Sequence, residues 1–357
     1  MNSVHKVLFL SLSGIGNYIM QSPTIARYKE AKPQSQITVW VAPRGTRKLA
    51  EADPNVDKII EMPIKTSIIQ HIQQLQILHQ KKFDIGIVLS PGQLIKSAAY
   101  LYLANIPERV GAQYNFGGNP QNSLFLTKSV KEKPNLHDIE QNLNLLTPLR
   151  VQPQKRITNY ELRITAKHKK EALKILSQNR IPTDKLLIGI HAGSSPEMTF
   201  KRWPSKNFAQ VATELIIQHN AHILIFGGPD EEAQKNKLQA QIEDRVPRSY
   251  KLEAISSVIS APLMATAAVL QKCELVLSND SGLMHLAAAT GVKTYGLFGP
   301  TNEKLTGPRG KDSHVIRAPG TKPVYDTDTS YQLGSGPHST ITAITPQMVL
   351  GQLELPH

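Results

Sequence analysis

Residues 275–301 read LVLSNDSGLMHLAAATGVKTYGLFGPT and contain the pattern that decides the fold. An apolar run over 275–278 is followed by apolar residues at helical spacing over 282–289, and by a second apolar run over 294–298. Two neighbouring strands that are joined through a helix run parallel. The stretch therefore predicts a parallel sheet covered by helices, which is an α/β fold.

The same alternation continues on both sides of this stretch. Further strands are expected at residues 6–11, 37–41, 84–89, 186–191 and 222–226. Helices are expected at residues 18–30, 44–51, 68–80, 95–103, 136–149, 207–219, 230–242, 261–272 and 346–355. The Gly, Pro, Ser and Thr content of residues 311–340 predicts a surface excursion without a packed element.

The length of 357 residues favours two domains, each large enough to bury a core of its own. The strand and helix pattern restarts after polar, Pro-marked segments at residues 151–159 and 181–183. We therefore expect an N-terminal domain at residues 1–155, a C-terminal domain at residues 180–340, and a final helical segment at residues 345–357.

Composition narrows the class of partner. The formal net charge is +13, which favours anionic partners, but Lys and Arg are dispersed and few aromatic residues lie among them. Nucleic acid is therefore not an expected partner. The single cysteine, Cys273, excludes an internal disulfide and fits a reducing, cytoplasmic location. The first apolar run leads into a glycine turn and reads as a buried strand. No apolar run is long enough to span a bilayer, so membrane contact would be peripheral.

The turn after the first strand is a candidate ligand site. It reads SGIGNY from Ser13 to Tyr18, with Gly14 and Gly16 placed where a strand passes into a helix. The amides of a helix N-terminus bind anions. A dinucleotide fingerprint would require a third glycine at position 19, which is Ile19. Only Arg44 favours an NADP site here. A tight turn without any ligand fits this sequence equally well.

A second candidate site follows the strand at 275–278, where Asp280, Ser281 and Gly282 open a helix. Bare amides and the helix dipole suit a diphosphate, although Asp280 could also serve only as a helix cap. His285 lies one turn into that helix, on the same face as Ser281. Capping does not explain His285, whose imidazole could reach the same ligand.

Two further strand ends of the second half carry similar groups. The segment HAGSS ends at Ser195 and precedes KRWP, so that hydroxyl groups and Lys201 could bind a phosphate. The turn FGGPD ends at Asp230, which could bind a ribose diol or cap a helix. Because carboxyl ends of parallel strands share one edge, these groups are expected to surround a single nucleoside diphosphate.

The sequence is similar to glycosyltransferase family 9, the heptosyltransferase family, over nearly the whole chain. The similarity lies in GIGNYIMQSP (14–23), KRWP (201–204), FGGPDEE (226–232) and above all SNDSGLMHLAAATGVKTYGLFGPT (278–301). The resemblance implies a GT-B fold of two facing Rossmann-like domains with parallel sheets. It also implies metal-free, inverting transfer of a heptose-like sugar from a nucleotide sugar such as ADP-heptose, without a cofactor, in lipopolysaccharide or other surface-glycan synthesis.

The resemblance also implies roles for individual residues. The acceptor would be a phosphorylated or lipid-linked saccharide. The enzyme would be a monomer that works at the inner face of the cytoplasmic membrane. Its final helix would pack on the N-terminal domain. Catalytic roles fall to Asn17, Lys201 and His285. The donor-binding candidates are Gly193, Ser194, Ser195, Lys201, Asp230, Asp280, Ser281, Gly282 and His285. The acceptor-side candidates are Gly14, Gly16, Asn17, Arg44, Lys96 and His137. No metal ligand is expected.

One position departs from the family pattern. Characterised members have an Asp, taken to be the catalytic base, where this chain has Asn17, and an amide cannot accept a proton at neutral pH. Three explanations stay open: another base such as His137 or Asp138, a substrate phosphate as base, or a binding protein with little catalysis. A noncatalytic nucleotide-sugar-binding protein and an NADP-dependent reductase are thus the alternatives to a transferase.

Overall fold

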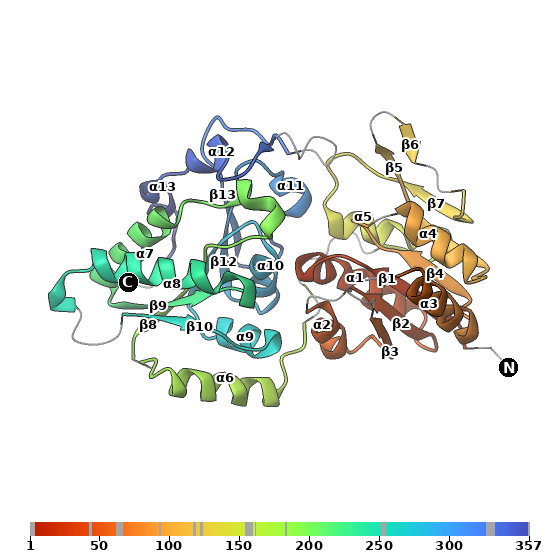
Figure 1. The fold of residues 1–357 in the computed structure, drawn as a ribbon, viewed down its shortest axis with the longest axis horizontal. Coiled ribbons are helices and arrows are strands. Elements are labelled where there is room, and N and C mark those ends of the chain that lie inside the picture. Colours follow the sequence, from red (N-terminus) through yellow and green to blue (C-terminus); the bar gives the residue numbers. More distant parts are fainter. Residues whose placement is uncertain are drawn as a thin grey trace. The chain divides into compact units, whose positions relative to one another are not determined.

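The chain forms two compact units, Met1–Arg163 and Ile164–His357, each of which is described by itself. The computed structural model describes residues 4–42, 45–61, 67–92, 94–116, 119–121, 124–153, 160, 162–182, 184–250, 255–325 and 333–355. Both units consist of a central sheet with helices around it (Figure 1). None of the helices in these ranges is long and apolar enough to cross a membrane.

The first unit is built on a sheet with the order β3-β2-β1-β4-β5-β6, to which β7 adds beside β5. The pairs are parallel except β5 with β6. Its strands are β1 (Lys6–Ser11), β2 (Gln36–Val41), β3 (Lys58–Glu61), β4 (Ile85–Val88), β5 (Glu108–Phe116), β6 (Asn119–Gln121) and β7 (Lys128–Lys131). Its helices are α1 (Ile15–Ala31), α2 (Thr46–Ala52), α3 (Ile68–Lys81), α4 (Leu94–Leu103), α5 (Asp138–Asn144) and the 3-10 turn η1 (Thr147–Leu149).

The centre of this sheet is β1, whose residues Val7 to Leu10 are almost fully buried. A strand that is covered on both faces reads as an unbroken apolar run, and this is why the N-terminal run was recognised as a strand. The chain continues from β1 to β2 on one side, and β4 lies on the other side. The carboxyl ends of β1 and β4 thus form a topological switch point, where open α/β sheets bind ligands.

The second unit repeats this plan with the order β10-β9-β8-β11-β12-β13, and every pair is parallel. Its strands are β8 (Leu186–His191), β9 (Ala221–Phe226), β10 (Ser256–Ile259), β11 (Leu275–Asn279), β12 (Lys293–Leu297) and β13 (Ser313–Ile316). Its helices are α6 (Ala166–Gln178), α7 (Ser205–His219), α8 (Glu232–Arg245), α9 (Leu263–Leu270), α10 (Gly282–Ala289), α11 (Glu303–Thr306), α12 (Ser339–Thr342) and α13 (Pro346–Leu350), with 3-10 turns η2 (Pro196–Lys201), η3 (Pro229–Glu231) and η4 (Arg248–Tyr250).

The C-terminal segment contributes side chains to the hydrophobic core of the second unit. Helix α13 packs on α7, and the side chains of Ile341, Ile344 and Val349 are fully buried in the cluster around Trp203. The indole N–H of Trp203 donates to the carbonyl of Ile344 at 2.8 Å. Packing of residues 345–357 on the N-terminal domain, expected from the family resemblance, stays a prediction.

The expected strands and helices are all present, most with ends shifted by a few residues. Two helices are shorter than predicted: the one expected at residues 136–149 is α5 followed by η1, and the one expected at residues 346–355 ends at Leu350. The prediction for residues 311–340 was wrong, because β13 and the start of α12 lie there. Strand β13 is an edge strand that pairs with β12, and the ring of His314 stacks on Tyr295 at 4.7 Å between centroids. An edge strand is half exposed and needs few apolar residues, so its flanking Gly and Pro dominated the sequence pattern. Helix α6 was missed for a similar reason: its sequence is strongly polar.

Candidate functional site

The candidate site of the second unit lies at the carboxyl ends of β8 and β11. These neighbouring strands are the point at which the strand order reverses, with β9 and β10 on one side and β12 and β13 on the other. The loop after β8 and the N-terminus of α10 after β11 therefore meet at the switch point of the sheet. Ligands of open α/β sheets bind at this position.

The buried side chain of Asn279 holds the loops of this site together. Its Nδ2 donates to the carbonyls of Ala192 at 2.8 Å and Gly193 at 3.2 Å, and its Oδ1 accepts from the backbone N–H of Trp203 at 3.0 Å. One amide thus joins the end of β11 to the loop after β8 and to the segment that follows Lys201. This role of Asn279 could not be predicted from the sequence, because a buried amide bridge between distant loops has no local pattern.

Lys201 and Asp280 form an ion pair inside this site. Lys201 ends η2, and its Nζ lies 2.8 Å from Oδ2 of Asp280; the side chains are 14% and 6% exposed. The ammonium also lies 6.0 Å from the centroid of the Tyr325 ring. Because an ammonium group has three N–H donors, the contact with Asp280 leaves it able to bind a phosphate oxygen as well.

Helix α10 points its N-terminus into the same site. Ser281 is the helix cap, and its Oγ accepts from the backbone N–H of Met284 at 3.4 Å. His285 is buried one turn further on, and its pKa responds to the charges of both Asp280 and Lys201. Burial, the strongest influence, lowers the pKa of His285 to about 4, so the ring is neutral at pH 7. Lys201, Asp280 and His285 are therefore brought together as the sequence analysis expected.

His191 and Glu231 add a hydrogen-bonded chain that sequence reasoning missed. The Nε2 of His191 lies 3.2 Å from Oε2 of Glu231, and its Nδ1 lies 3.0 Å from Oγ of Ser281 and 3.3 Å from Oγ of Ser278. Burial raises the pKa of Glu231, but the hydrogen bonds from His191 and the Gly228 amide lower it overall. In the tautomer that carries its proton on Nε2, His191 donates to the Glu231 carboxylate and leaves Nδ1 to accept from a serine hydroxyl.

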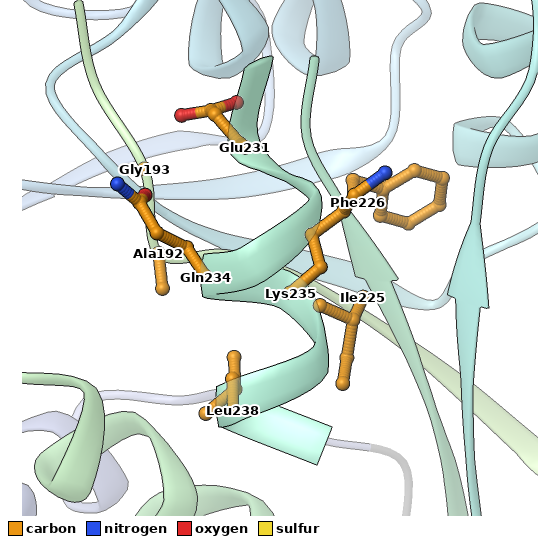
Figure 2. A pocket seen from close by; sticks show the side chains of 8 residues that line it. All are labelled: Ala192, Gly193, Ile225, Phe226, Glu231, Gln234, Lys235 and Leu238. Carbon is orange, nitrogen blue, oxygen red and sulfur yellow. The ribbon is translucent and has the colours of Figure 1, made fainter. Parts of the chain in front are cut away.

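The position of Glu231 depends on the glycine at 193. A Cβ at this position would lie 1.6 Å from Oε1 of Glu231, so any other residue would displace the carboxylate. Both residues are among those that line a small cavity (Figure 2), namely Ala192, Gly193, Ile225, Phe226, Glu231, Gln234, Lys235 and Leu238. Asp230, the acid chosen from the sequence, is exposed on η3, and Glu231 is the one turned inward. The two adjacent acids could not be distinguished without the geometry of that turn.

Ser194 and Ser195 support the loop that presents Lys201. The Oγ of Ser194 donates to the carbonyl of Met198 at 2.9 Å and accepts from Nε of Arg202 at 3.1 Å. Ser195 is exposed and donates to the carboxylate of Glu197. In this structure the two hydroxyl groups shape the loop, and their direct contact with a donor phosphate stays a prediction.

The first unit has its own candidate site at the switch point between β1 and β4. Gly14 precedes α1, Gly16 is buried, and Asn17 is half-buried in the first turn. Two residues after the end of β4, the carbonyl of Ser90 accepts from Nε2 of Gln21 at 2.9 Å and from Nδ2 of Asn142 at 2.7 Å. Helices α1 and α5 are thus tied to the end of β4.

The remaining acceptor-side candidates lie on neighbouring elements. His137 caps α5 and is buried, with Nδ1 accepting from the backbone N–H of Ile139 at 3.2 Å. A neutral ring that accepts at Nδ1 carries its proton on Nε2, so His137 as placed is a donor there. Lys96 is exposed in the first turn of α4. Arg44 lies outside the described residues.

The chain is similar to known proteins in sequence and in fold. The model of the family described as glycosyltransferase family 9 (heptosyltransferase) matches residues 71–333. Lipopolysaccharide heptosyltransferase 2 of Salmonella typhimurium is 28% identical, covering 98% of this chain and 97% of the relative.

Among solved structures, the Escherichia coli ADP-heptose lipopolysaccharide heptosyltransferase II has a TM-score of 0.75 at 24% identity, covering 97% of this chain and 96% of that one. A glycosyltransferase of family 9 from Veillonella parvula has a TM-score of 0.79 at 22% identity, covering 98% and 97%. These likenesses confirm the expected GT-B fold class of two Rossmann-like units.

Proposed function

Because the chain belongs to glycosyltransferase family 9, we propose that it transfers a heptose-like sugar from a nucleoside-diphosphate sugar to a saccharide acceptor. The observation that carries this proposal is the Lys201–Asp280 pair at the N-terminus of α10, beside the buried His285. A cation, helix amides and a neutral imidazole at a switch point are suited to a diphosphate leaving group. The family assignment speaks against an NADP-dependent reductase.

The donor we propose is ADP-heptose. This assignment rests on the similarity to the Escherichia coli ADP-heptose lipopolysaccharide heptosyltransferase II and on the site chemistry above. The diphosphate would lie at Ser281 and Gly282, against Lys201, and the ribose would lie near Glu231. Asp230, Gly193, Ser194 and Ser195 would line the rest of the donor site.

The reaction we propose is a direct displacement with inversion, without a metal ion or a cofactor. The acceptor oxygen attacks the anomeric carbon, and the bond between that carbon and the diphosphate oxygen breaks, so its electron pair leaves with the nucleoside diphosphate. Lys201, the first amides of α10 and His285 stabilise the charge that develops on the departing oxygen. By analogy with the loss of one donor from an oxyanion hole, removal of one such group is expected to cost about 10²–10³ in turnover.

The proton of the acceptor hydroxyl needs a base, and Asn17 cannot be that base. Its half-buried amide can orient the hydroxyl by a hydrogen bond. His137 would have to move its proton from Nε2 to Nδ1 and lose its contact with Ile139 before it could act. We therefore favour a phosphate oxygen of a substrate as the proton acceptor. A nucleotide-sugar-binding protein with little catalysis is the second candidate, and Asn17 is the observation in its favour.

The acceptor we propose is a phosphorylated, lipid-linked saccharide of lipopolysaccharide or a related glycan, as the names of the curated relatives indicate. A monomer working at the inner face of the cytoplasmic membrane fits such an acceptor. Gly14, Gly16, Lys96, His137 and Arg44 are the proposed residues on the acceptor side.

A transfer assay tests the proposal. The full chain is incubated with ADP-heptose and a delipidated core oligosaccharide that lacks heptose, and products are analysed by mass spectrometry. We expect the mass of one heptose to be added for each ADP released. Binding of ADP-heptose without release of ADP, with several acceptors, would instead support the nucleotide-sugar-binding protein.

A further inference from the structure

The first unit has a group of exposed isoleucines at one end of two adjacent helices. Ile68 is 79% exposed, Ile69 is 67% exposed, and Ile72 and Ile95 are each 50% exposed. The first three occupy the first two turns of α3, and Ile95 lies in the first turn of α4. We call these four residues the isoleucine surface. Single exposed apolar side chains are ordinary, whereas a group of large ones marks an interaction site.

Helices α3 and α4 contact each other near this surface. Nδ1 of His71 contacts the hydroxyl of Tyr100, and the two rings lie 5.7 Å apart between centroids. Leu78 is the fully buried side chain of α3, on the side of the helix where His71 and Leu75 are half-buried. At 100° per residue, Ile68, Ile72 and Ile69 lie in this order further and further around the helix from its buried side. The isoleucines are therefore not part of the core of the first unit.

The isoleucine surface lies on two helices whose charged side chains are all basic. Neither α3 nor α4 contains an Asp or Glu, and the exposed Lys96 follows Ile95. Residues 1–163 contain 20 Lys and Arg against 11 Asp and Glu, a net charge of +9, whereas residues 164–357 contain 21 against 17, a net charge of +4. Most of the excess positive charge of the chain thus belongs to the unit that carries this surface.

The surface also lies at the ligand-binding edge of the first sheet. Each helix that follows a parallel strand begins near the carboxyl end of that strand, so α3 after β3 and α4 after β4 both begin at the edge where the Gly14–Gly16 turn lies. Helices α3 and α4 are seen together in the first unit in Figure 1. An acceptor bound at that turn would be close to the isoleucine surface.

We propose that the isoleucine surface docks the first unit onto an anionic lipid bilayer. The isoleucines enter the boundary between headgroups and acyl chains, and Lys96 and the other basic residues of this unit attract the anionic headgroups. This inference rests on the proposed function in one respect: the docked edge would face an acceptor whose lipid anchor lies in the same membrane.

Vesicle sedimentation of the full chain tests the docking. The probes are vesicles of phosphatidylcholine alone and of phosphatidylcholine mixed with phosphatidylglycerol. We expect the wild-type chain to sediment with the anionic vesicles and to be released by high salt. The triple variant Ile68→Ser, Ile69→Ser, Ile72→Ser should lower the partition coefficient by at least about tenfold. Lys96→Gln should lower it by about fivefold.

The matched control is Leu173→Ser, which changes a side chain that is 57% exposed on α6 of the second unit and should leave sedimentation unchanged. The docking would be overturned by a wild-type chain that stays in solution with anionic vesicles, by equal sedimentation of the triple variant, or by a change in oligomeric state caused by the triple variant without vesicles. A lower Tm of that variant would also overturn it, since the surface would then be covered by another part of the chain.

Transfer to the delipidated acceptor keeps this test separate from the test of the proposed function. If docking alone is correct, the triple variant loses vesicle binding whether or not the chain transfers heptose. If the transfer proposal is correct and docking is wrong, wild-type and triple variant transfer sugar equally to delipidated and to vesicle-bound acceptors.

Discussion

Substitution of Lys201 by Ala should damage both stability and turnover, and the two effects can be separated. At 2.8 Å and an effective dielectric constant of about 20, the gross attraction between Lys201 and Asp280 is roughly 6 kcal/mol. Desolvation of both groups offsets most of it. Removal of Lys201 alone leaves the Asp280 carboxylate buried without its cation. We therefore expect the free energy of unfolding to fall by about 3–5 kcal/mol.

The double variant Lys201→Met, Asp280→Asn separates the two effects. It removes both charges, so urea unfolding should show most of the lost stability restored. Turnover at saturating donor should remain about 10²–10³-fold below wild type, because no cation faces the leaving diphosphate. Lys237→Ala, which removes an exposed lysine of α8, is the control and should change neither quantity. Wild-type turnover of the double variant would refute the role of Lys201 in catalysis.

Three further predictions concern single residues. His285 has a pKa of about 4 in the folded chain against 6.5 unfolded, so its contribution to stability is complete above pH 6.5 and is lost as the pH falls toward 4, by about 3 kcal/mol in total. His285→Gln should therefore flatten the pH dependence of the free energy of unfolding, measured in urea, between pH 6.5 and 4. An equal slope in the variant and the wild type would contradict this prediction. Asn17→Asp should preserve or raise the turnover number by supplying a carboxylate beside the acceptor, with a gain of up to about 10². Loss of donor binding in that variant, with acceptor binding intact, would show that position 17 was assigned to the wrong substrate. His191→Asn has a side chain too short to reach both Glu231 and Ser281, so the Ser281 hydroxyl loses a hydrogen bond worth about 1 kcal/mol. The donor KM should therefore rise about fivefold with a smaller change in kcat. An unchanged KM measured by ADP release would exclude this positioning role.

Sequence reasoning predicted the repeated βα plan because buried parallel strands are apolar along their whole length. It failed where strands lie at an edge, as in β13, or where a helix is mostly polar, as in α6. Both kinds of element bury few side chains, so their apolar pattern is too weak to recognise.

The sequence was sufficient to group candidate residues that lie within one short segment. Asp280, Ser281 and His285 lie within six positions, and the helix geometry alone places them together. The pair of His191 and Glu231 and the bridge made by Asn279 join segments that are distant in the chain. Such contacts follow from the strand order of the sheet, which the sequence pattern does not contain.

A crystal structure of the chain with ADP tests the central claim most directly, namely that three strand ends of the second unit form one diphosphate site. We predict phosphate oxygens within hydrogen-bond distance of the Ser281 and Gly282 amides and of the Lys201 ammonium. ADP bound instead at the Gly14–Gly16 turn, with Lys201, Asp280 and His285 making no contact with it, would contradict the account.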